Sequence, residues 1–389
     1  MADSNRRGHR GRRPIGRAIE CATLVVAVLV AACSPSRTVA QPANDAQLQQ
    51  QLTLPAGLRV EYFAHIPAAR WLVQGPDGSV YVSVARRGEI VRLFALSHLG
   101  VPDSQAVVIT GLNEPHGMAF HKRSFYVANN DGVVRFDLDA RGVPTGSPTY
   151  VNHYGGGSGH STRTIVFGPD SAMYVSDGSS CNVCVERDST RATVMRFDES
   201  GANGRVFASG LRNAVGVAVN PATREIWVTV NERDNLEPGH QNSPPDKLNI
   251  IHAGGFYGWP YCWGNRNASP EFNEPARCAA MVVPALNVQA HSAVLGITFL
   301  DRATALPAGL RGDALVASHG SWNRDMPTGD KIIRVHIANG QPQSYDDFIT
   351  GWQRPDGSRW GRVADVMVAA DGSLLITDDE AGAVYRVFQ

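Results

Sequence analysis

Polar side chains that can accept protons or bind anions gather in short segments beside predicted strands. His160 stands in Gly159-His-Ser-Thr-Arg163, and Arg212 stands in Gly210-Leu-Arg-Asn213. A neutral imidazole acts as a general base near pH 7, and a guanidinium binds carboxylates or an oxygen that becomes anionic. The two segments predict acid–base chemistry on a group that develops negative charge. For His160 the alternative is an ordinary surface-loop histidine.

A third polar segment supplies oxygen ligands. Asn231-Glu232-Arg233-Asp234 follows the apolar run 226–230 and opens an irregular loop that ends at Asn249. Carboxylates and free carbonyls are the ligands that Ca²⁺ prefers, so this segment is a candidate calcium site, with a solvated charged loop as the alternative. Three further segments combine aromatic residues with glycine, namely 254–263, 318–324 and 359–362, and the last two also contain basic residues. For the aromatic segment, a planar ring ligand and plain packing remain equal alternatives.

Arginines recur at similar positions of these segments, which predicts a polyanionic ligand in one channel. They are Arg163, Arg212, Arg233, Arg324, Arg359 and Arg362. The chain has no phosphate-binding glycine loop before a helix, no GxSxG and no HExxH. This pattern argues against hydride transfer to a nicotinamide bound by a Rossmann domain.

The elements that must position these residues repeat along the chain. A turn followed by a β-branched or aromatic strand occurs at 75–84, 168–177, 220–230 and 370–378, with weaker copies at 120–129 and 312–318. Strands with a basic residue follow most copies, as in Ile90-Val-Arg-Leu93. Six units of three or four strands, without a long amphipathic helix between residues 53 and 389, predict an all-β, six-bladed β-propeller. A large sandwich or two barrels are the alternatives.

The charge balance divides into two parts. The sequence has 36 Lys+Arg and 36 Asp+Glu, but without residues 1–32 there are 30 basic against 34 acidic residues. A mildly acidic body argues against a nucleic-acid partner.

The first residues have the features of an export signal. An arginine-rich stretch precedes the apolar run 22–32, which is too short to span a bilayer as a helix. Val30-Ala-Ala-Cys33 is similar to a bacterial lipobox, which predicts lipidation of Cys33; a plain signal cleaved near Ala32 or Ala40 is the alternative. We expect a signal at residues 1–32, a flexible tether at 33–52 and a propeller at 53–389. The location would be periplasmic or at the outer membrane or cell surface, with a lipid anchor as the only membrane contact.

Four cysteines remain outside the signal, and they allow three pairings. Sequence proximity favours Cys181–Cys184 and Cys262–Cys278 as disulfides of an oxidising compartment. The Cys181-Asn-Val-Cys184 segment has two alternatives, half of a metal site or a redox pair.

The chain resembles the glucose/sorbosone dehydrogenase family from about Leu52 to Val387. This family comprises six-bladed propellers that use pyrroloquinoline quinone (PQQ) with calcium, and the sorbosone and pyranose dehydrogenase branches are the most similar. The resemblance rests on an ordered set of motifs: His160 before Gly168-Pro-Asp170, Gly210-Leu-Arg-Asn213, Pro245-Asp-Lys-Leu-Asn249, Tyr257-Gly-Trp-Pro260, His319-Gly-Ser-Trp-Asn-Arg324 and Arg362-Val-Ala-Asp365.

The resemblance implies roles for individual residues. His160 matches the catalytic base, Arg212 and Asn213 match the pair that contacts the quinone oxygens, and Arg362 matches an arginine that holds a cofactor carboxylate. Further cofactor contacts are expected from the remaining polar residues of these segments, namely Arg163, Asn231, His319, Asn323 and Arg324.

The resemblance also implies a calcium site. It falls on the main-chain carbonyls of Glu232 and Arg233, with Asp234 nearby, and Tyr257 marks a candidate second site. Lys247 departs from the family pattern, because relatives often carry an acidic residue there. This departure puts the second ion in doubt.

The expected function is oxidation of a sugar or an aldehyde, with electrons passing to a separate carrier such as a quinone or cytochrome c. The alternatives are a calcium-dependent lactone hydrolase and a non-catalytic exported binding propeller. Carboxylates would dominate the channel of a hydrolase, whereas here arginines do. The sequence leaves the substrate undefined, because specificity is expected in loops such as 97–115, 140–160 and 265–285.

Overall fold

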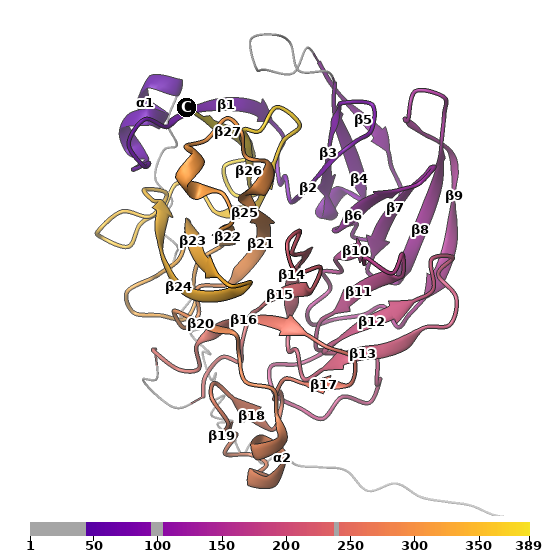
Figure 1. Ribbon diagram of the computed structural model, residues 1–389, viewed down its shortest axis with the longest axis vertical. Coiled ribbons are helices and arrows are strands. Elements are labelled where there is room, and N and C mark those ends of the chain that lie inside the picture. Colours follow the sequence, from indigo (N-terminus) through magenta and orange to yellow (C-terminus); the bar gives the residue numbers. More distant parts are fainter. Residues whose placement is uncertain (1–43, 95–103, 237–240) are drawn as a thin grey trace, which may run out of the picture. The chain divides into compact units, whose positions relative to one another are not determined.

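The computed structural model describes residues 44–94, 104–236 and 241–389, which form six antiparallel sheets arranged around a common centre (Figure 1). The predicted signal and Cys33 lie outside the described residues. The all-β, six-bladed propeller expected from the sequence is therefore confirmed. Among the described residues, no helix combines the length and the apolar character needed to cross a membrane.

Each sheet is made of strands that follow one another along the chain, and the innermost strand comes first. The first two sheets are β2 (Trp71–Gln74), β3 (Val80–Val84), β4 (Glu89–Leu93), β5 (Gln105–Ile109) and then β6 (Met118–His121), β7 (Ser124–Asn129), β8 (Gly132–Leu138), β9 (Pro144–His153). The third is β10 (Ile165–Phe167), β11 (Met173–Asp177), β12 (Thr193–Phe197), β13 (Arg205–Ser209), with β17 (Gly255–Phe256) added at its edge. The fourth is β14 (Ala214–Val219), β15 (Ile226–Val230), β16 (Asp246–Ile251), β20 (Leu286–Val288). The fifth is β21 (Val294–Phe299), β22 (Ala314–Ser318), β23 (Lys331–Ala338), β24 (Gln341–Ile349). The sixth is β25 (Val363–Val368), β26 (Leu374–Asp378), β27 (Ala383–Phe388), completed by β1 (Arg59–His65).

Strand β1 closes the ring, because it pairs with β27 in the last sheet and brings Tyr62 opposite Tyr385. Closure leaves no long sheet edge open between the first and last blades. Helix α1 (Asp45–Gln51) lies beside β1, with Leu48 fully buried and the Asp45 carboxylate accepting the Tyr62 N–H. The prediction of a flexible tether is thus wrong for residues 45–51, because their apolar face packs on the propeller.

The remaining elements are short. A hairpin of β18 (Cys262–Trp263) and β19 (Asn267–Ala268) and helix α2 (Pro275–Ala280) extend from the fourth sheet. Single 3₁₀ turns occur at Ala85–Arg87, Leu300–Arg302 and Ala308–Leu310.

The repeated turns found in the sequence connect the first and second strands of each blade, and they explain the basic residue in the third strand. In the third sheet the turn residue Asp170 pairs with Arg196 of β12 at 2.7 Å. In the last sheet Asp371 pairs with Arg386 of β27 at 2.7 Å. The pairs fix the turn against the same blade's third strand, so the sequence repeat is a structural repeat.

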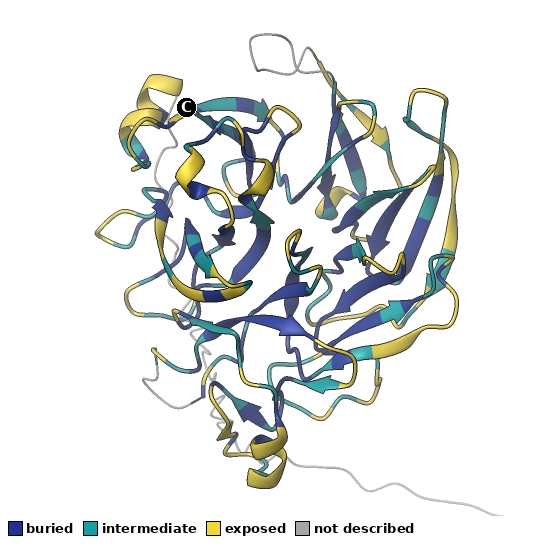
Figure 2. Cartoon of the chain, viewed as in Figure 1, coloured by how far each residue is buried: buried dark blue, intermediate teal, exposed yellow. Residues whose placement is uncertain are grey.

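The core lies between neighbouring blades, where the second strands are buried along their full length, as the dark blue strands in Figure 2 show. Near the centre the innermost strands approach so closely that a Cβ on Gly216 would collide with the carbonyl of Leu295. Thr229 donates a hydrogen bond to that same carbonyl at 2.6 Å. The close packing gives the channel rigid walls.

The fold brings the candidate residues to one end of the channel. In an antiparallel sheet, the beginning of the first strand and the end of the second lie at the same edge. The candidate segments occupy these two kinds of connection: 154–164, 210–213 and 350–362 enter innermost strands, whereas 231–245 and 319–330 follow second strands.

Candidate active site

A cavity of about 240 Å³ opens at this end of the channel. It is lined by many of the residues that the sequence predicted, together with five that were not singled out as site residues. The predicted ones are His160, Arg212, Asn213, Asn231, Glu232, Asp234, His319, Asn323 and Arg362, and the others are Asp246, His291, Ala293, Gly320 and Trp322. Trp322 is 73% exposed, so its indole ring is open to solvent at the cavity.

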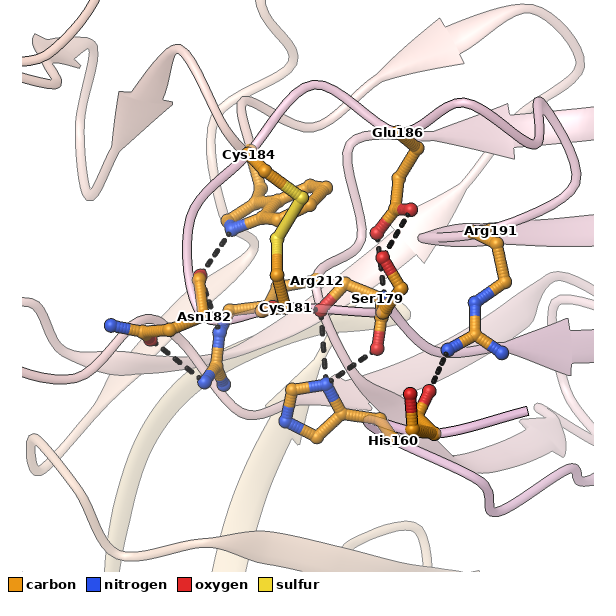
Figure 3. The surroundings of a disulfide bond; sticks show 11 residues. His160, Ser179, Cys181, Asn182, Cys184, Glu186, Arg191 and Arg212 are labelled. Atoms are coloured by element: carbon orange, nitrogen blue, oxygen red, sulfur yellow. Dashed lines mark hydrogen bonds between the residues drawn. A yellow bond between two sulfur atoms is a disulfide. The ribbon is translucent and has the colours of Figure 1, made fainter. Parts of the chain in front are cut away.

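His160 is held by the connection that follows β11. Its Nδ1 lies 3.0 Å from the carbonyl oxygen of Ser179 and 2.9 Å from the Ser179 hydroxyl, as Figure 3 shows. The hydroxyl donates its own hydrogen to the carbonyl of Cys181 at 2.7 Å, so Nδ1 carries the proton and donates to Ser179. Nε2 consequently keeps its lone pair.

The protonation state of His160 follows from its surroundings. Burial, and secondarily the charge of Arg212, lowers the pKa of His160 to about 4. The imidazole is therefore neutral at pH 7, and Nε2 is able to accept a proton.

Arg212 is fixed by carbonyl and carboxylate acceptors on two sides. Its Nη1 donates to the carbonyl of Glu232 at 2.7 Å, and its Nη2 reaches the Asp234 carboxylate at 3.2 Å. On the other side, Nε and Nη2 donate to the main-chain and side-chain oxygens of Asn182 at 3.1 and 2.9 Å. The guanidinium is a preorganised positive charge beside His160.

Asp234 links three parts of the cavity wall. Its carboxylate accepts a hydrogen bond from Asn323 Nδ2 at 3.0 Å and lies 3.5 Å from Nδ1 of His291. Although burial opposes ionisation, the bond to His291 and the charge of Arg212 lower the pKa of Asp234. The pKa of His291 is raised by Asp234 and Asp246 against its own burial.

Asp246 lies behind this loop, at the start of β16. Its carboxylate accepts the main-chain N–H of Glu232 at 2.9 Å and that of Ala293 at 2.8 Å. Burial raises the pKa of Asp246 to about 7. The side chain ties the 231–234 segment to the connection that enters β21.

A second histidine lines the cavity from the fifth sheet. Nε2 of His319 lies 3.0 Å from the carboxylate of Asp379 and 3.1 Å from Nη1 of Arg70. Burial lowers the pKa of His319 to about 4, although Asp379 opposes the shift. Arg362 donates to the carbonyls of His319 and Gly320 at 3.0 and 2.9 Å, and these two bonds hold its guanidinium against the same wall.

Several buried oxygens of the cavity have no hydrogen-bond partner within the part of the chain that the structure describes. They are the side-chain oxygens of Asn213, Asn231 and Asn323. A buried amide oxygen without a partner is costly, so these atoms fit a bound ligand with hydrogen-bond donors or a cation. Arg212 and Arg362 line the same cavity, so it offers a polar ligand both cationic donors and oxygen acceptors.

The prediction that six arginines meet in one channel is wrong for four of them, because only Arg212 and Arg362 line this cavity. Arg163 is completely buried and pairs with Asp177 at 2.8 Å, while its Nη1 donates to the carbonyl of His160 at 2.8 Å. Arg233 is buried and forms a two-point ion pair with Glu271, both bonds 2.7 Å, and Arg359 pairs with Glu380 at 2.8 Å. The predicted cofactor contact of Arg163 is thus replaced by support of the His160 backbone.

Arg324 and Tyr257 also lie elsewhere. Arg324 bonds the side chain of Asn242 at 3.3 Å and so fastens the loop that carries Trp322. The carbonyl of Tyr257 accepts a hydrogen bond at 2.9 Å from Lys247, whose ammonium is fully buried and 2.6 Å from the Glu232 carboxylate. The Tyr257 carbonyl, which was a candidate ligand for a second metal ion, therefore already accepts a hydrogen bond from the Lys247 ammonium.

The cysteines pair as the sequence favoured, Cys181 with Cys184 and Cys262 with Cys278. Cys181, Cys184 and Glu186 lie close enough together to hold a metal ion, but both sulfurs belong to the disulfide and no thiolate is free. This excludes the half metal site considered from the sequence.

The site missed by sequence reasoning is the Arg70, Asp379 and His319 cluster. Arg70 directly precedes β2, just as Arg163 and Arg362 precede or nearly precede their innermost strands. The position of Arg70 just before an innermost strand was thus the pattern that could have identified it as a site residue. No comparable pattern marks His291, because its contacts depend on the loop that returns to β21.

Fold and cavity together define a six-bladed propeller whose channel ends in a site lined by histidines, two arginines and three carboxylates. A model of the TrAA12-like family matches residues 55–277 and 267–387, and the chain belongs to this family. The resemblance to PQQ-dependent sugar dehydrogenases that the motifs indicated is confirmed, whereas a sorbosone activity remains a prediction.

Curated relatives have low sequence identity to this chain but align with it over long stretches. A PQQ-dependent pyranose dehydrogenase of Coprinopsis cinerea is 25% identical over 378 residues, which cover 78% of this chain and 50% of that protein. The chain therefore spans about half the length of this relative. An aldose sugar dehydrogenase of Escherichia coli is 27% identical over 198 residues, with 49% of this chain and 45% of that protein covered.

Solved structures share the fold. The holo form of the PQQ domain of the Coprinopsis cinerea pyranose dehydrogenase has a TM-score of 0.76 and 23% identity, covering 90% of this chain and 98% of that one. The PQQ-bound aldose sugar dehydrogenase of Streptomyces coelicolor has a TM-score of 0.60 and 17% identity, covering 86% and 99%.

Proposed function

We propose that the protein is a PQQ-dependent dehydrogenase that oxidises a sugar or aldehyde, with His160 as its general base. The observation that carries this proposal is the neutral imidazole of His160, with a free lone pair on Nε2, beside the fixed Arg212 cation in one cavity. Membership of a family with PQQ-dependent relatives supports the choice of cofactor.

The cavity residues fit PQQ, a planar quinone that carries carboxylates. Arg362 would bind a cofactor carboxylate, and Arg212 with Asn213 would bind the quinone oxygens. Asn213 lines the cavity and would donate to a quinone oxygen from its side-chain Nδ2, and Arg362 still faces the cavity after its two carbonyl bonds. When bound, PQQ supplies the two-electron acceptor for the hydrogen leaving the substrate carbon.

His160 performs the acid–base part of the reaction. Nε2 accepts the proton of the substrate hydroxyl, or of the hydrated aldehyde, while the substrate loses two electrons as hydride. Burial and the charge of Arg212 disfavour the imidazolium, so the proton passes on readily to solvent before the next turnover. Arg212 stabilises the negative charge that develops on the oxygen of the acceptor.

Calcium is proposed at the 231–234 segment. The side-chain oxygen of Asn231 and the carboxylate of Asp234 are hard oxygen ligands at the same cavity, and the carbonyl of Glu232, which already accepts Arg212 Nη1 at 2.7 Å, would join them through its second lone pair. Arg233 offers only its carbonyl, because its side chain pairs with Glu271. We do not extend this proposal to Tyr257, whose carbonyl receives Lys247.

The two disulfides support an extracytoplasmic location. We propose that residues 1–32 are a signal, that Cys33 carries the lipid anchor, and that a separate quinone or cytochrome c removes the electrons. A lactone hydrolase or a binding propeller is not favoured, because the named relatives are dehydrogenases.

Reconstitution tests the function. Purified protein without its signal is titrated with PQQ in the presence of Ca²⁺, and aldoses and aldehydes are then screened with an artificial acceptor dye. We expect saturable PQQ binding and dye reduction that requires PQQ. Lactone hydrolysis without PQQ, or PQQ binding without any dye reduction, would favour the hydrolase or the binding protein.

A further inference from the structure

The connection between β11 and β12 contains the four-residue ring Cys181-Asn182-Val183-Cys184, which the reaction described above does not use. The ring is only partly covered, and Val185 just after it is 57% exposed. Its polar atoms nevertheless point to the candidate active site rather than to solvent, as Figure 3 shows for Asn182.

Asn182 uses both side-chain atoms and its carbonyl to hold the site. Its Oδ1 accepts hydrogen bonds from Arg212 Nη2 at 2.9 Å and from the main-chain N–H of Asp234 at 2.8 Å. Its Nδ2 donates to the carbonyl of Asp234 at 2.8 Å. Its own carbonyl accepts from Arg212 Nε at 3.1 Å and from the indole of Trp259 at 3.0 Å.

The same ring holds His160 at its other end. The carbonyl of Cys181 accepts the Ser179 hydroxyl at 2.7 Å, and that bond makes the Ser179 oxygen an acceptor for His160 Nδ1. One short ring therefore fixes the tautomer of His160, the direction of the Arg212 guanidinium and the backbone at Asp234.

We propose that the Cys181–Cys184 ring is a positioning element of the active site, and that Asn182 is the residue through which it acts on Arg212 and the 231–234 segment. The role of Arg212 toward the cofactor rests on the function proposed above. Asn182 does not itself line the cavity, so it acts through Arg212 and Asp234, which do.

The disulfide explains how a partly exposed connection can hold Arg212 and the 231–234 segment in place. Five hydrogen bonds to one residue require a defined backbone, and ordering a free loop costs conformational entropy at each residue. A closed ring of four residues has already lost much of this freedom. Asn182 is thereby preorganised for its partners.

The first test compares the wild type with Asn182→Ala and Asn182→Asp. Alanine removes every side-chain bond to Arg212 and Asp234, whereas aspartate keeps the Oδ1 acceptor that both of them use. We expect Asn182→Ala to weaken PQQ binding and to lower kcat by roughly 10–100-fold, the usual effect of losing a supporting shell. We expect Asn182→Asp to recover part of both losses and the KM for sugar to change little in either variant.

A second readout needs no cofactor. Hydrogen exchange of the peptide that covers residues 231–236 should be faster in Asn182→Ala than in the wild type, because the Asp234 N–H loses its acceptor. This measurement separates the two proposals. Faster exchange in a protein that never binds PQQ would refute the proposed function and leave the positioning role intact.

The second disulfide provides a matched control. Cys262–Cys278 lies in the β18–α2 excursion and lines no part of the cavity. We expect Cys181→Ser/Cys184→Ser to weaken PQQ binding and to accelerate exchange at 231–236, and Cys262→Ser/Cys278→Ser to lower only the melting temperature. If Asn182→Ala does not fold, Asn182→Asp and the two serine pairs decide the question.

Two results would overturn the proposal. The first is an Asn182→Ala protein with the PQQ affinity and the 231–236 exchange of the wild type. The second is an equal loss of PQQ affinity in both serine pairs, which would mean that the ring acts only through global stability.

Discussion

Two of the three histidines that line the cavity, His160 and His319, have different partners. Nδ1 of His160 donates to an uncharged carbonyl, and its neighbouring charge is the Arg212 cation. His319 contacts the Asp379 carboxylate and Arg70, so its ring belongs to an ion-pair cluster. Burial lowers the pKa of both to about 4. The difference indicates that His160 is free to exchange a proton, whereas His319 is a fixed part of the wall.

The largest expected effect is the loss of this base. His160→Ala should lower kcat by roughly 10²–10⁴-fold with little change in PQQ affinity. His319→Asn, which keeps a polar group beside Asp379, should lower kcat by only roughly 2–10-fold, the worth of one hydrogen bond. Steady-state kinetics of both reconstituted variants tests this difference between the two histidines. An equal loss of kcat in the two variants would contradict it.

Arg362 should matter for binding more than for chemistry. Arg362→Gln keeps a side chain able to reach the carbonyls of His319 and Gly320 but removes the charge proposed to meet a cofactor carboxylate. We expect PQQ to bind roughly 10–100-fold more weakly, since charged hydrogen bonds contribute about 1.5–3 kcal/mol. Fluorescence titration with PQQ measures this, and unchanged affinity would exclude the contact.

The pH profile distinguishes the histidines by another route. Since the pKa of His160 is about 4, the base form is present at neutral pH, and kcat/KM should fall only as the pH drops through about 4. Asp379→Asn should leave this acid limb in place, because Asp379 contacts His319 and not His160. A limb near pH 6.5 in the wild type would contradict the buried environment assigned to His160.

The smallest effect on catalysis is expected from Trp322, the exposed residue of the cavity lining. Trp322→Ala removes an exposed ring that is free to pack against a sugar, and we expect KM to rise roughly 2–10-fold with kcat unchanged, as for a contact worth about 0.5–1.5 kcal/mol. A fall in kcat of similar size would instead place Trp322 against the reacting group.

The sequence was informative where one residue type determines local structure. The Asp and Gly turns, followed by buried β-branched strands, were sufficient to predict six blades, and the position of His160 and Arg212 before innermost strands placed them at one end. Arg163 stands at an equivalent position, yet it pairs with Asp177 inside the protein. Such a difference depends on which side chains meet across a blade, and no local pattern records it.

The same limit applies to contacts between distant segments. Asn182 and Asp234 are 52 positions apart and His319 and Asp379 are 60 apart, so these contacts exist only once neighbouring blades have packed together. The helix at 45–51 was missed because its composition is that of a polar linker, and only the burial of Leu48 gives it a place.

The most direct test of the central claim is the reduction of bound PQQ by sugar in the absence of any electron acceptor, followed by absorbance after rapid mixing. The account predicts that His160→Ala binds PQQ as the wild type does, reduces it roughly 10²–10⁴-fold more slowly, and recovers rate when imidazole is added. Reduction by His160→Ala at the wild-type rate would show that His160 is not the base.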